Sequence, residues 1–201
     1  MRKADLKKNH AWFEEKLAYY DDFFARTINA KQVLNTSDKR EIAESSLLRL
    51  CAYWEAFVGE ELVDCVNIDG SKLGEFVGTQ LPQQLSLAMC EAILFRERYL
   101  DFRSVGEIKG FAKKVLPDKV NPFAKIPKHA EEKIDEAFVI RNYLSHQSKA
   151  ARRRLSEMYR AKYQRRRFAE PGGFLLAKNS KRLVEYVGSF FVASKEMAKI
   201  I

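Results

Sequence analysis

The chain has 201 residues, a formal net charge of +9 and a hydrophobic content of 46%, a balance that suits one globular domain with a buried core. The longest apolar runs, FLLA at 174–177 and GSFFVA at 188–193, are far shorter than the roughly 20 residues that span a bilayer. Composition and the length of the apolar runs therefore exclude a disordered chain and a membrane-spanning helix. The start MRKADLKKNH is not followed by an apolar signal core, so we expect a cytoplasmic protein.

Two amphipathic helices are predicted in the first third of the chain. Residues 5–34 carry apolar side chains close to the 3.6-residue helical period. After NTSD at 35–38, Asp38 and Glu41 have the spacing of a capping box that would open a second helix. This helix runs to about Val66 and carries a wide apolar stripe, so we expect it at the centre of the core.

Glycines and prolines divide the middle of the chain into shorter elements. The segment NIDGSKLGEFVGTQLP at 67–82 is predicted to be mostly loop. A third helix is expected after Pro82, running to about Leu100, and a short one at about 104–116. Three prolines in LPDKVNPFAKIP exclude a long helix in that segment.

The last third of the chain is again mostly helical. A helix is predicted from Lys128 to about residue 148, a basic segment follows, EPGG at 170–173 interrupts the chain, and a last helix spans about 178–200. No stretch alternates as a strand. The predicted fold is an all-α bundle of four to five main helices plus short helices, with an up-and-down core, in a single domain over 1–201.

The three cysteines, Cys51, Cys65 and Cys90, lie among apolar neighbours on predicted helices and form no C-x-x-C pair. They are therefore expected to be buried thiols. The three histidines of the chain do not have the spacing of a metal site. We expect neither a metal nor another cofactor.

Most of the excess charge lies in one segment. Between Lys149 and Phe168 there are nine basic residues and one acid, a local charge of +8. A field of one sign attracts polyanions, which favours nucleic acid as a partner. The alternative is a solvated helix face followed by a basic loop. The side chains predicted to bind nucleic acid are Lys149, Arg152, Arg153, Arg154, Arg160, Arg165, Arg166 and Arg167.

The segment RNYLSH brings Arg141, Asn142 and His146 together near the end of a predicted helix. It resembles the signature of HEPN domains, in which an arginine, a polar neighbour and a histidine shortly after them form a ribonuclease active site. The preceding helix SSLLRLCAYWEAFVGEELVDC is similar to the long helix of RiboL-PSP-type and MAE-type HEPN proteins. The resemblance implies RNA as substrate, a homodimer with a composite active site, and a role in toxin–antitoxin, phage-defence or stress systems, with an antitoxin protein as a further partner.

The three residue types also suit metal-independent RNA cleavage by attack of the 2′-hydroxyl group. His146 can accept and donate a proton near neutral pH, because histidine titrates at about 6.5. Arg141 stays charged and binds phosphate oxygens bidentately, which stabilises the charge of the pentacoordinate phosphorus. Asn142 would orient the histidine or bind a phosphate oxygen. The products would be a 2′,3′-cyclic phosphate and a 5′-hydroxyl.

Three further residues are supporting candidates. Glu55 interrupts an apolar stretch of the second helix, where it would either orient Arg141 or Asn142 or lie on the outer face of the helix. Ser145 and Tyr143 would add hydrogen bonds.

Helical geometry constrains how Arg141 and His146 can act together. A regular helix turns by about 100° per residue, so the two side chains would point about 140° apart. One undistorted helix cannot aim both at one phosphate. Either the helix ends or bulges near Ser145, or two copies of the motif face each other across a twofold dimer interface.

Two other functions fit the same residues. One is a HEPN-fold protein that binds nucleic acid or a nucleotide without cutting it. The other is a structural or adaptor helical bundle whose dimer face includes this segment. Separately, the motif itself has a purely structural alternative, in which His146 interacts with the last carbonyls of its helix and Arg141 pairs with Glu136 or Asp135.

Overall fold

The computed structural model describes residues 4–29, 34–82, 85–95, 102–177 and 181–200. Within these ranges the chain is all-helical, with 82% of its residues in helices and no strand. The predicted fold class is therefore confirmed. No helix in the described ranges is long and apolar enough to cross a membrane.

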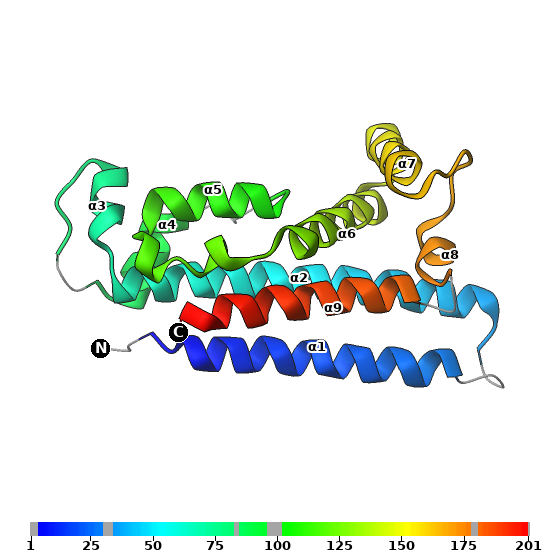
Figure 1. Ribbon diagram of the computed structural model, residues 1–201, viewed down its shortest axis with the longest axis horizontal. Helices are drawn as coiled ribbons and strands as arrows, with labels where there is room; N and C mark the ends of the chain where they lie inside the picture. The colour runs from blue at the N-terminus through cyan, green and yellow to red at the C-terminus, as the bar shows by residue number, and fades with distance from the viewer. Residues whose placement is uncertain (1–3, 30–33, 83–84, 96–101, 178–180, 201) are drawn as a thin grey trace.

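Four long helices form the centre of the molecule: α1 (Leu6–Asn29), α2 (Thr36–Ile68), α6 (Lys128–His146) and α9 (Lys181–Met197). α1 packs against α2 and α9, and α6 packs against the same two helices. Figure 1 shows α1 and α6 on opposite sides of α2 and α9, with helix directions alternating along the chain. This is the predicted up-and-down core.

Aromatic side chains on α1, α2 and α9 fill the centre of the bundle. Phe13 stacks on Phe57 with 4.5 Å between ring centres, and Trp54 contacts Phe190 at 5.6 Å. All four side chains are fully buried. Their helical spacing puts them on the inner faces of the three helices. The three cysteines are also buried, as predicted.

The start of α2 differs from the prediction. Asn35, not Asp38, caps the helix: its side-chain oxygen accepts from the backbone N–H groups of Ser37 and Asp38. The Asp38 carboxylate accepts from the Asn35 N–H at 3.0 Å and completes the capping box. The Asp38–Glu41 box was therefore wrong, because the same kind of motif is available one turn earlier and lengthens the helix.

The segment 67–82 also differs from the prediction, because it contains α3 (Ser71–Val77). Leu73 is fully buried, and Gly78 ends the helix in the left-handed region at φ 71°. The next helix, α4 (Leu87–Phe95), begins later than Pro82, and its expected continuation to Leu100 lies outside the described residues.

The proline-containing segment after α5 (Val105–Val115) forms only the short 3-10 turns η1 (Asp118–Val120) and η2 (Pro122–Lys125), as its prolines predict. The remaining elements are α7 (Lys149–Tyr163), α8 (Pro171–Leu175) and η3 (Ala198–Ile200). α7 packs on α6 and α8 packs on α2. Figure 1 shows α7 and α8 near the C-terminal end of α6.

Candidate functional site

The RNYLSH segment forms the last turns of α6, which stays helical through His146. The helix ends at His146, one residue after Ser145, so its end lies near Ser145 as one of the two alternatives predicted, although Arg141 and His146 are both still within its helical part. Asn142 and His146 are four positions apart and therefore share one face of the helix. Arg141 points about 140° away from His146. Within one copy of the chain, the regular helix thus directs the two side chains toward different surroundings.

His146 and Ser145 are exposed, and Asn142 is half-buried. Among the residues that the structure describes, the side chains of these three make no hydrogen bond or ion pair. His146 is followed by Gln147 in the left-handed region at φ 46°, and the Ser148 side chain accepts from the Ala151 N–H at 3.2 Å and caps α7. The histidine therefore lies at a sharp junction between two helices and is open to a ligand.

Arg141 pairs with Glu55 of α2. The shortest contact, from Arg141 Nη2 to Glu55 Oε1, is 3.2 Å. The Glu55 side chain is 8% exposed and that of Arg141 is 28% exposed. Glu55 therefore lies toward α6 and not on the outer face of its helix. The alternative pairing of Arg141 with Glu136 or Asp135 is wrong, because those carboxylates bind other groups.

Tyr143 lies against the chain that connects α7 with α8. Its hydroxyl donates to Glu170 Oε2 at 3.5 Å, and its ring meets Phe168 edge-on with 5.5 Å between centres. Burial, followed by the charge of Glu170, raises the pKa of the Tyr143 hydroxyl. Tyr143 is therefore a neutral hydrogen-bond donor at physiological pH.

The basic segment forms α7 and the connection that follows it. Ala151, Leu155 and Tyr159 are buried at four-residue spacing, which leaves the other faces of α7 to solvent. Arg153 and Glu157 approach to only 3.9 Å, and both are well exposed, so this pair compensates little of the positive charge. Of the eight side chains predicted to bind nucleic acid, Arg165 is half-buried against Phe174 and seven are exposed: Lys149, Arg152, Arg153, Arg154, Arg160, Arg166 and Arg167.

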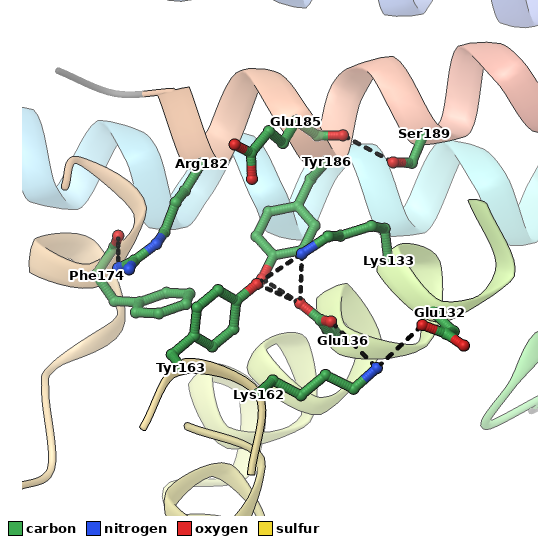
Figure 2. Close-up of polar contacts among 10 residues, drawn as sticks. All are labelled: Glu132, Lys133, Glu136, Lys162, Tyr163, Phe174, Arg182, Glu185, Tyr186 and Ser189. Carbon is green, nitrogen blue, oxygen red and sulfur yellow. Dashed lines mark hydrogen bonds and ion pairs between the residues drawn. The ribbon is translucent and has the colours of Figure 1, made fainter. Parts of the chain in front are cut away.

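Glu136 holds the C-terminal end of α7 against α6 and α9 (Figure 2). This buried carboxylate accepts from the hydroxyls of Tyr163 at 2.5 Å and Tyr186 at 3.2 Å. Lys133 lies 3.1 Å from it and also donates to Tyr163 at 2.7 Å. Burial, together with Tyr163 and Glu136, raises the pKa of Tyr186, which stays protonated and donates. The basic helix is thereby fixed relative to the RNYLSH segment.

Sequence reasoning missed Glu136 and Tyr163 as anchors, and it missed Phe168 and Glu170 beside Tyr143. An aromatic residue within a run of arginines is a usable signal for Tyr163 and Phe168. Glu136 and Glu170 had no such signal, because the tyrosine that each of them binds is 27 positions away in the sequence.

Two cavities lie away from the RNYLSH segment. One of about 720 Å³ is lined by the end of α2, by α3 and by the residues after it, Thr79, Gln80, Leu81, Pro82 and Leu85. Another of about 360 Å³ lies beside the start of α1 and is lined by Cys65, Pro122 and Ile200, among others. Neither of these two cavities includes a residue of RNYLSH. Across the described ranges, no three His, Cys, Asp or Glu side chains gather as metal ligands.

Comparison of the chain with family models, with curated proteins and with solved structures finds no match.

Proposed function

We propose that this protein is an endoribonuclease that cuts RNA by attack of a 2′-hydroxyl group on the adjacent phosphate. As the bond from the 2′-oxygen to phosphorus forms and the bond to the 5′-oxygen breaks, His146 either accepts the proton of the 2′-hydroxyl or donates a proton to the leaving 5′-oxygen. Arg141 binds the phosphate oxygens as charge develops on them, and Asn142 orients His146 or adds a hydrogen bond to the phosphate. The exposed arginines of α7 hold the RNA backbone.

One observation supports this proposal above the others. His146 is exposed and unpartnered within the described residues, and it lies at the junction from which the basic helix α7 starts. A polyanion bound along α7 would therefore pass beside a group that can move a proton near neutral pH.

The angle between Arg141 and His146 favours a site made by two copies of the chain. In a twofold dimer, Arg141 of one copy and His146 of the other would face the same phosphate. The proposal includes such a homodimer. If the site is shared, mixing the inactive variants Arg141→Ala and His146→Ala restores part of the activity, because mixed dimers keep one intact site. If each copy carries its own site, the mixture stays inactive.

A second candidate function is RNA binding without cleavage. It is favoured by the pairing of Arg141 with Glu55, which already satisfies the guanidinium in the unliganded chain. A mainly structural Arg141 would leave the basic face of α7 as the functional surface. The adaptor alternative has less support, because an adaptor has no need of seven exposed basic side chains on and after α7.

Incubation of the purified protein with RNA in excess EDTA tests the proposal. We expect fragments with 2′,3′-cyclic phosphate and 5′-hydroxyl ends. A substrate with a 2′-deoxy sugar at a mapped cleavage position should resist cleavage there, because the attacking hydroxyl is missing. Intact RNA that is nevertheless shifted in a gel would favour the second candidate.

A further inference from the structure

A cation, a carboxylate and two aromatic rings from three segments meet beside the RNYLSH segment. Arg152 of α7 places its guanidinium carbon 4.3 Å from the centre of the Phe168 ring. The same ring meets Tyr143 of α6 edge-on. Glu170, two positions after Phe168, accepts the Tyr143 hydroxyl at 3.5 Å. Arg152 and Glu170 are therefore linked through the two rings, by the contacts of Arg152 with Phe168, of Phe168 with Tyr143 and of Tyr143 with Glu170.

The two charged groups are available to a ligand, whereas the rings beneath them are not. Arg152 and Glu170 are exposed, Phe168 is half-buried and Tyr143 is buried. The Arg152 guanidinium lies over the Phe168 ring, and because Arg152 is exposed, the rest of the guanidinium is open to solvent. A guanidinium held on a ring is already ordered, so binding costs it little further freedom. Within the described residues, the Arg152 side chain makes no ion pair, and the single polar contact of the Glu170 side chain is at the limit of a hydrogen bond.

The position of Glu170 needs a reason if the neighbouring surface binds RNA. A carboxylate next to a segment of charge +8 weakens phosphate binding. An unpaired base can offset this cost, because it brings hydrogen-bond donors to the carboxylate and a flat ring to the arginine. The exposed Arg152 guanidinium, supported from below by the Phe168 ring, and the exposed Glu170 carboxylate match that requirement.

The chemistry of the carboxylate selects one base. Two carboxylate oxygens form a pair of adjacent acceptors. Guanine presents two adjacent donors, N1–H and the N2 amino group, on its Watson–Crick edge. Adenine and cytosine each present one donor beside an acceptor, and uracil presents one donor between two acceptors. Only guanine satisfies both oxygens without bringing a lone pair against them.

We infer that Arg152, Phe168 and Glu170 form a subsite for an unpaired guanine. The base stacks on the outer face of Arg152, and Glu170 accepts its N1–H and N2–H groups. The weak contact with the Tyr143 hydroxyl is given up. This inference rests on the proposed function in one respect, because it places the guanine beside the phosphate at which His146 would cleave the RNA.

Binding of short oligouridine strands with a single central G, A, C or U tests the subsite. Affinities are measured by fluorescence anisotropy on His146→Ala protein, so that the strands stay intact. We expect the G strand to bind about tenfold more tightly than the U strand. Glu170→Gln should abolish this preference, because an amide offers one acceptor and one donor. Glu157→Gln, which removes the same charge from an exposed position on α7, should keep it.

Equal affinity for all four strands overturns the subsite, and so does a guanine preference that survives Glu170→Gln. Arg152→Lys keeps the charge but not the plane and should weaken G-strand binding, and unchanged binding would contradict the stack. Incubation of the unmutated protein with the same strands separates this inference from the proposed function. Guanine-selective binding without cleavage refutes the nuclease and supports the subsite, whereas cleavage without base preference refutes the subsite alone.

Discussion

Arg141 on α6 and Glu55 on α2 form an ion pair with 3.2 Å between Nη2 and Oε1, although 86 positions separate them in the sequence. The pair fixes the direction of Arg141 at the end of the helix that also carries His146. Because the Glu55 side chain is nearly enclosed, the charge of Arg141 compensates a carboxylate that water reaches poorly.

A double-mutant cycle on Glu55 and Arg141 should give a coupling energy of about 1–3 kcal/mol. The expectation follows from the low exposure of the Glu55 side chain, because water screens an enclosed ion pair less than an exposed one. Chemical denaturation of the two single alanine variants and the double variant measures it. The exposed pair Arg153 and Glu157 is the control and should couple by less than about 0.5 kcal/mol. Equal coupling energies for the two pairs would mean that Glu55 and Arg141 interact no more strongly than an exposed ion pair, which would contradict the prediction.

Tyr163→Phe should loosen α7 from the bundle. The variant removes one hydroxyl that serves both Glu136 and Lys133, and we expect a loss of about 1–3 kcal/mol in the free energy of unfolding. Hydrogen exchange along α7 should become faster. Tyr19→Phe, at a ring that is 55% exposed, should change neither measurement. If both variants behave like the unmutated protein, Glu136 does not anchor the helix.

Gly172→Ala should destabilise the contact between α8 and α2. A Cβ atom at this position would lie 2.8 Å from the Arg40 carbonyl oxygen and 2.9 Å from its Cα, so backbone must move. Overpacking of this kind costs about 1–3 kcal/mol. At Gly173 the same atom would meet only the Arg40 side chain, at 3.7 Å or more, and Gly173→Ala is therefore the control. Thermal denaturation should give Gly172→Ala a lower melting temperature than Gly173→Ala. Equal melting temperatures would contradict the close approach of Gly172 to Arg40.

Asp64 should make stability depend on pH. Burial, with the nearby charges of Glu61 and Glu60, raises the pKa of this carboxyl group to about 6, above the value of about 3.9 expected in the unfolded chain. The folded state therefore binds the proton more tightly, and this group adds stability as the pH falls from 7 through 6 toward 4. Asp64→Asn should raise the melting temperature at pH 7, and the gain should shrink at pH 5. A gain that is constant with pH would contradict the raised pKa.

Apolar periodicity predicted the long helices, because each of them turns one continuous face toward the core. It failed at α3, where the glycines of segment 67–82 indicated a loop although a single buried side chain, Leu73, holds a short helix in place. The capping pattern was ambiguous at the start of α2, because Asn35 and Asp38 are each followed three positions later by an acidic residue. The sequence therefore did not identify which of the two residues caps the helix.

The candidate site was only partly predictable. Glu55 was a candidate because one acid interrupts an apolar stripe, and its contact with Arg141 is confirmed. The hydrogen bonds of Tyr163 with Glu136 and of Tyr143 with Glu170 form only because α7 and the connection after it fold back on α6. No local sequence pattern encodes this arrangement.

The comparison of His146→Ala with His129→Ala tests the central claim most directly. Both histidines are exposed on α6, at opposite ends of the helix, so the two variants remove the same side chain with a similar small effect on stability. RNA is incubated with each purified variant in excess EDTA, and the cleavage rate is measured. We expect His146→Ala to lose cleavage by a factor of at least about 100, whereas His129→Ala should cut like the unmutated protein. Cleavage that survives His146→Ala, or RNA that stays intact with the unmutated protein, would contradict it.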